Sequence, residues 1–110
     1  MFGNKMAKIS KLAAKQKASR LVSLSHDKNM DVRLAAISAL GCCENDDAYN
    51  ALIPMLRDNN GDVRIASARA LATLGRSSAR VHISHQLSAE KDPKVEAAMR
   101  EAIGKLQTKD

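Results

Sequence analysis

An eleven-residue pattern occurs three times along this chain, and this repetition constrains the fold more than any other feature. The pattern begins at Asp31, returns at Asp62 and returns again, in weaker form, at Lys94, so the copies are 31 and 32 residues apart. A period of this size is typical of a solenoid, whose units can hide their apolar sides only against neighbouring units. The sequence therefore predicts a stack of similar units.

Each copy has the apolar spacing of a helix. A mostly apolar stripe recurs at every fourth position, and small alanines flank it, so that the two sets form one broad helical face. Since Phe2 and Tyr49 are the only aromatic residues, we expect neighbouring helices to approach closely across alanine. The stripe positions are Val32, Ala36, Leu40, Val63, Ser67, Leu71, Val95, Met99 and Ile103, and the alanines are Ala35, Ala39, Ala66, Ala70, Ala98 and Ala102.

Helix-start signals precede the three copies. Asn29, Asn60 and Asp92 each lie three residues before the first valine, where a side-chain oxygen can accept hydrogen bonds from free backbone N–H groups. An amphipathic segment precedes each copy, and Pro54 should kink the second of these segments because it removes one helical hydrogen bond. The expected preceding helices cover residues 17–25, 46–57 and 77–89, and an upstream helix covers residues 5–14, which gives about seven helices.

One segment carries a family resemblance. It comprises Ile53-Pro54-Met55-Leu56-Arg57-Asp58, then Gly61-Asp62-Val63-Arg64 and a stripe that ends at Leu74-Gly75. This segment resembles the HEAT repeat superfamily, especially the short HEAT-like repeats of phycobilisome lyases, and the resemblance covers residues 17–106. It implies an all-α fold, an αα-superhelix (solenoid) of about three HEAT-like helix pairs with an extra N-terminal helix. The expected organisation is a basic N-terminal helix or cap at 1–16 and a repeat domain at 17–110, with repeats at 17–43, 46–75 and 77–106.

The resemblance also implies a ladder of ion pairs between successive repeats. In the family, the Asp and Arg of an Asp-Val-Arg motif form this ladder. Carried over to this chain, the motif residues are Asp31, Arg33, Asp62 and Arg64, and Arg33 would face Asp62. Because Lys94 and Glu96 occupy the motif positions of the third copy, that copy departs from the pattern and resembles a capping repeat.

The favoured function is a protein-interaction scaffold. HEAT-like second helices line a concave surface, and Arg69, Arg76, Arg80 and Arg100 lie on or after the second helices, so we expect them to contact another protein. Rigid stacked helices lose little entropy when they bind. The chain is expected to be a monomer or a weak homo-oligomer.

The alternative function rests on charge. The net charge is +6, and residues 1–20 alone contain six bases and no acid, so the rest of the chain is formally neutral. Lys5, Lys8, Lys11 and Lys15 then predict a nucleic-acid or anionic-surface contact, against the simpler interpretation of a solvated outer face on a capping helix. The resemblance adds a third, least favoured interpretation, which is a lyase or chaperone-lyase subunit that acts on a bilin-bearing protein.

Chemistry-bearing motifs are missing from the sequence. His82 and His85 lack a third ligand, and the His-Glu pairs of the HEAT-like hydroxylase that acts on deoxyhypusine do not occur. Since nucleophile triads, phosphate loops and paired carboxylates are also absent, we expect no enzyme, no catalytic residue, no metal and no cofactor. No apolar run is long enough to span a membrane. Cys42 and Cys43 are adjacent and so cannot easily bridge each other, which favours the cytoplasm.

Overall fold

Helices account for all the regular structure in the described part of the chain. The computed structural model describes residues 2–107, and over this range it contains seven helices and no strand, as the sequence predicts. The helices are α1 (Phe2–Ala14), α2 (Ala18–Leu24), α3 (Met30–Leu40), α4 (Asp46–Met55), α5 (Gly61–Leu74), α6 (Ala79–Ala89) and α7 (Pro93–Gln107).

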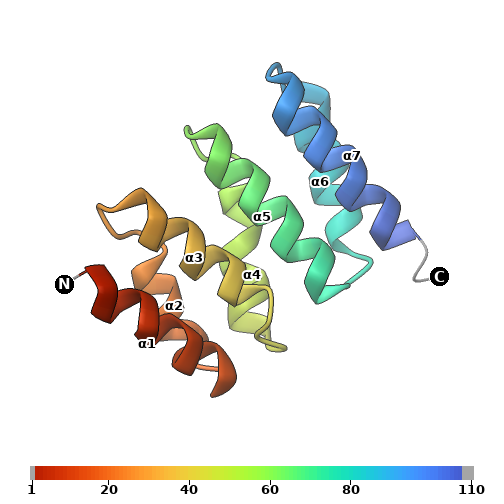
Figure 1. Ribbon diagram of the computed structural model, residues 1–110. Coiled ribbons are helices and arrows are strands. Elements are labelled where there is room, and N and C mark those ends of the chain that lie inside the picture. The colour runs from red at the N-terminus through yellow and green to blue at the C-terminus, as the bar shows by residue number, and fades with distance from the viewer. Residues whose placement is uncertain (1, 108–110) are drawn as a thin grey trace.

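The helices form two layers (Figure 1). In one layer α3, α5 and α7 lie side by side, and α1 packs beside α3 at the N-terminal end. The other layer contains α2, α4 and α6. Each helix of this second layer packs on the helix that follows it in sequence, which gives the pairs α2–α3, α4–α5 and α6–α7. This arrangement is the predicted αα-superhelix.

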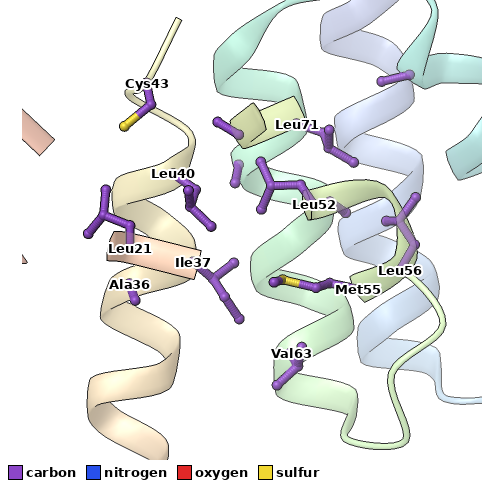
Figure 2. Close-up of a cluster of buried hydrophobic side chains, with 14 of the residues drawn as sticks. Leu21, Ala36, Ile37, Leu40, Cys43, Leu52, Met55, Leu56, Val63 and Leu71 are labelled. Carbon is purple, nitrogen blue, oxygen red and sulfur yellow. The ribbon is translucent and has the colours of Figure 1, made fainter. Parts of the chain in front are cut away.

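The predicted helical stripe forms the core. Eight of its nine positions are buried and Ile103 is half-buried. The second layer contributes Leu21, Leu52 and Ile83, which are fully buried and recur at intervals of 31 residues. Figure 2 shows part of this core, with the side chains of Ile37 and Leu40 extending from α3 toward α5. Burial of a leucine or isoleucine side chain contributes about 1.5–3 kcal/mol to stability. Each repeat therefore gains this contribution from one fully buried side chain of its second-layer helix.

The predicted helix caps are confirmed in all three copies. The side chain of Asn29 accepts a hydrogen bond from the backbone N–H of Val32, and the side chain of Asn60 accepts from Asp62 and Val63. Asp92 caps α7 in the same way through the N–H of Lys94. Each cap residue also donates its own N–H to an acid two residues earlier, namely Asp27, Asp58 or Glu90. The turns inside the three helix pairs therefore share this pattern of side-chain hydrogen bonds, with Glu90 and Asp92 in the third turn where the other two have Asp and Asn.

The boundaries differ from the prediction at α1 and α4. Helix α1 begins at Phe2 and not at Lys5. Helix α4 ends at Met55, so Pro54 lies in its last turn, where the prediction placed a kink within a longer helix. The chain tightens there, because the N–H groups of Leu56 and Arg57 bond to carbonyls only three residues back.

A close approach between repeats occurs at Gly41. This residue has an ordinary helical φ of −63°, so the backbone conformation does not require glycine. The lack of space requires it, because a Cβ atom at Gly41 would lie 3.0 Å from the Cα atom and 3.1 Å from the carbonyl oxygen of Ala70. Ala70 itself is buried. The end of α3 therefore packs directly on the backbone of α5, as the alanine-lined face predicts.

We expect Gly41→Ala to destabilise the protein by about 1–3 kcal/mol, because the added methyl group overpacks a contact whose other side is backbone. Urea unfolding followed by circular dichroism measures this loss. Gly104→Ala is the matched control, since no atom lies within 4 Å of a Cβ at that position in α7; it should stabilise the fold by about 0.5–1 kcal/mol. Equal stability of the two variants would show that α3 and α5 do not depend on this contact.

Candidate binding groove

An open groove crosses the exposed side of the layer that contains α3, α5 and α7. Its volume is about 570 Å³. Because all three helices contribute, the groove exists only in the stacked arrangement and in no single repeat. Its lining residues are Leu34 and Ser38 from α3, Asp62, Ile65, Ala66 and Arg69 from α5, and Lys94 and Ala97 from α7.

The repeat register explains this lining. Leu34, Ile65 and Ala97 occupy equivalent positions in the three copies. They form an apolar column that crosses the helices. Three residues before this column lie the charged positions Asp62 and Lys94, and four residues after it lies Arg69. Spacings of three and four residues place side chains on one helical face, so α5 lines the groove with the apolar Ile65 between the charged Asp62 and Arg69.

The groove offers both apolar surface and charge. Leu34 and Ile65 are half-buried, while Asp62, Arg69 and Lys94 are exposed. Within residues 2–107, no ion pair engages any of these three charged side chains. The two cations and one carboxylate are therefore available to a bound molecule, with a small excess of positive charge.

Of the four arginines expected to bind a partner, the structure places only Arg69 in the groove. Arg100 is exposed on α7 but does not line it. Arg76 and Arg80 lie beyond the end of α5, where Gly75 adopts a left-handed φ of 77° and the chain turns toward the other layer. These four side chains therefore do not line one groove, because Arg76 and Arg80 follow the turn after Gly75 and Arg100 lies outside the lining. Their contact with a partner stays a prediction.

Arg76 has a local structural role. Its guanidinium lies 2.9 Å from Asp46 and 4.9 Å above the centre of the Tyr49 ring. The hydroxyl groups of Tyr49 and Ser78 are 2.8 Å apart. These contacts join the start of α4 to the turn before α6. The ion pair is exposed, so it contributes little by itself.

The four lysines of the N-terminal helix that were expected to contact an anionic surface also separate into two groups. Lys5 donates to Asp27 across 2.6 Å, and this hydrogen bond lowers the pKa of Asp27. Lys8, Lys11 and Lys15 are exposed and form no such pair within the described chain. Lys5 therefore attaches α1 to the first repeat, whereas the other three lysines face solvent.

The expected ladder from Arg33 to Asp62 does not occur, since no ion pair joins them in the part of the chain that the structure describes. Arg33 instead donates to the carbonyl of Asp27, in the turn that precedes its own helix. Asp31 and Asp62 are exposed in the first turns of α3 and α5, where negative charge favours the helix dipole.

The link between repeats runs through a different acid. Arg64 Nε and Nη2 donate to the two carboxylate oxygens of Glu90, at 2.8 and 3.0 Å, while Nη1 donates to the carbonyl of Asp58. The hydrogen bonds from Arg64 lower the pKa of Glu90. Only 6% of the Glu90 side chain is exposed. Arg64 thus joins the turn of its own repeat to the turn of the next one.

A comparison with known families matches this architecture. A family model described as HEAT repeats matches residues 13–110. The chain belongs to the HEAT-repeat family. No curated protein matched its sequence closely enough to serve as a relative.

Sequence reasoning missed most residues of the groove in this HEAT-repeat chain. Leu34 and Ile65 lie outside the buried stripe, and Lys94 was treated only as a departure from a motif. The signal was nevertheless present: apolar residues at equivalent positions outside the stripe indicate an exposed apolar column. Repeat alignment, and not charge alone, identifies such a surface.

The remaining chemistry-bearing residues do not form a further site. His82 and His85 are exposed on α6, and a search of the described residues found no group of three ligands able to hold a metal. Cys42 is exposed and Cys43 is buried, and burial raises the pKa of the Cys43 thiol. Among the described helices, none is both long and apolar enough to cross a bilayer.

We expect Glu90→Gln to destabilise the HEAT-repeat stack by about 1 kcal/mol at neutral pH, because the charged partner of Arg64 is lost from a partly buried site. Since the folded pKa of Glu90 lies below its ordinary value of 4.5, the pair stabilises the fold above that pH, and the contribution is lost as the pH falls through the folded pKa.

Urea unfolding of both proteins from neutral to acid pH measures this linkage. The difference in stability should be complete at neutral pH and should disappear in acid. Glu101→Gln, at an exposed position of α7, is the control and should leave stability unchanged. A difference that persists undiminished in acid would mean that the carboxylate charge is not what stabilises the pair.

Proposed function

We propose that the groove across α3, α5 and α7 binds a short segment of another protein. The observation that carries this proposal is the apolar column of Leu34, Ile65 and Ala97, which crosses three helices and lies open to solvent at their exposed side. Apolar surface in a rigid hollow is a common feature of sites where a protein segment docks. HEAT repeats commonly serve as protein-interaction scaffolds, which agrees with this role.

The groove charges define the partner further. Arg69, Lys94 and Asp62 are all exposed; Asp62 and Lys94 occupy equivalent positions in successive repeats, and Arg69 lies at the other end of the α5 side of the groove. A segment with apolar side chains for the central column and with acidic residues at its edges complements this arrangement. Arginine on an interface contributes both packing and directed hydrogen bonds, so Arg69 is the side chain on which the proposed specificity depends most.

The chain acts in this proposal as a binding module without catalysis or cofactor. HEAT-repeat proteins are generally non-enzymatic. Cytoplasmic location belongs to the same proposal, and the adjacent pair Cys42 and Cys43, which are both free, supports it. The protein would function as a monomer or a weak homo-oligomer.

A peptide selection on the full chain tests the groove. Peptides are selected from a random library, and their affinities are measured by fluorescence polarisation. The double substitution Arg69→Glu/Lys94→Glu should weaken the selected acidic peptides at least tenfold, a loss of about 1.4 kcal/mol. Ala97→Arg, which places a long side chain at an exposed position of the groove, should weaken all the selected peptides.

Two controls match these substitutions in chemistry but lie outside the groove. Arg57→Glu/Lys91→Glu makes the same change in charge, and Ala89→Arg makes the same change in size; all three positions are exposed. Both controls should retain affinity. Selected peptides that bind the groove variants and the control variants equally well would show that the binding surface lies elsewhere.

A further inference from the structure

A second surface lies at the N-terminal end of the stack, away from the groove. Lys8 and Lys11 lie on α1, and Lys15 directly follows its last residue and still bonds through its N–H to the carbonyl of Lys11; with intervals of three and four residues, the three lysines lie in one row. All three are exposed. Seven residues of helix span about 10 Å, which is the length of this row. The apolar side of the same helix, with Ile9 and Leu12, is buried in the core.

The row continues around the turn into α2. A hollow of about 460 Å³ lies at this corner, and Lys15 belongs to both the row and the hollow. The basic corner therefore consists of five cations: Lys8, Lys11, Lys15, Lys17 and Arg20. Each of the five is exposed, and none has an ion-pair partner in the described chain. The hollow is lined by Leu12, Lys15, Lys17, Ser19 and Arg20.

The shape of the basic corner is fixed by Gln16. This residue adopts a left-handed φ of 57°, a conformation that costs energy for a side chain other than glycine. Its amide accepts a hydrogen bond from the N–H of Glu44 at 2.7 Å and donates one to the carbonyl of Cys42 at 3.0 Å. The turn between α1 and α2 is thus bound to the turn between α3 and α4. The five cations are therefore presented on a rigid support.

We propose that the basic corner binds the phosphate backbone of double-stranded DNA without reading its sequence. A duplex presents one phosphate charge per about 1.7 Å of its axis, or roughly six over the 10 Å of the lysine row. Cations that lack a protein partner can neutralise these phosphates and release condensed counterions, which drives such binding. Lys5 is excluded from this surface because Asp27 already holds it.

Two other polyanionic surfaces fit less well. Stable attachment to a membrane needs an apolar or lipid anchor in addition to basic residues, and the apolar side of α1 is occupied by the protein core. Single strands are gripped mainly by aromatic stacking, and the ring of Tyr49 lies at the start of α4 under Arg76. The regularly spaced phosphates of a DNA duplex therefore fit the row of lysines best.

Fluorescence anisotropy with a labelled DNA duplex of about 20 base pairs tests the proposal on the full chain. Five phosphate contacts predict a slope of about −4.5 for log K against log salt, so affinity should fall about 500-fold between about 50 and about 200 mM salt. Lys8→Gln/Lys11→Gln/Lys15→Gln leaves two contacts, and its affinity should fall only about 10-fold over the same range.

The control is Arg57→Gln/Lys91→Gln/Arg100→Gln, which removes the same charge from exposed positions outside both the basic corner and the groove. It should keep the slope of the wild type, and thermal melting should show that both variants are folded. An unchanged salt slope in the triple-lysine variant would overturn the proposal, as would failure of the wild type to bind duplex at low salt. Sedimentation with phosphatidylcholine vesicles containing about 30% phosphatidylserine, without duplex binding, would assign the surface to membranes instead.

Discussion

The structure depends on the close contact between helices of the same layer. Gly41 and Ala70 allow α3 and α5 to approach at the distance of backbone contact, and the buried residues Ala98 and Ala102 continue this small-residue face on α7. With almost no aromatic residues, the chain fills its core by bringing backbones together and not by inserting large rings. Leucine and isoleucine from the second layer then occupy the space that remains, as Leu21, Leu52 and Ile83 do. This contact sets the spacing of α3, α5 and α7. The groove forms on the exposed side of these helices because they lie at this spacing.

Much of this architecture is predictable from the sequence. The repeat period indicates where each helix begins and which of its side chains are buried. The stripe from Val32 to Leu40 and the caps at Asn29 and Asn60 are local features, and they lie where the sequence places them. Side chains that reach from one repeat to another are harder to assign. Arg33 does not reach Asp62 of the next helix but bonds to the carbonyl of Asp27, whereas Arg64 pairs with Glu90 in the turn before α7. Both outcomes depend on side-chain length and on where a turn lies in space. The position of Arg76 likewise depends on the turn at Gly75, which a periodic pattern does not describe.

The charges of the molecule are divided between two surfaces with different physical properties. The groove combines half-buried apolar side chains with a nearly balanced set of charges at Asp62, Arg69 and Lys94, which suits selective contact with another protein. The basic corner has five of the six cations of residues 1–20, and this segment contains no acid, which suits long-range attraction that salt weakens. Both surfaces include helices of one layer, α1 at one end and α3, α5 and α7 along the rest. The same rigid layer can therefore serve both.

The hydrogen bonds of Gln16 have a consequence for how the stack opens. In a solenoid, the terminal helix is held only by its neighbours and is free to fray without disturbing distant units. Here Gln16, in the turn between α1 and α2, is bonded across 26 and 28 positions to Cys42 and Glu44. Detachment of α1 must break these bonds as well as the contacts of Ile9 and Leu12. Fraying at this end is thereby coupled to the turn between the first and second helix pairs, and the first forty-odd residues should open together as one cooperative unit.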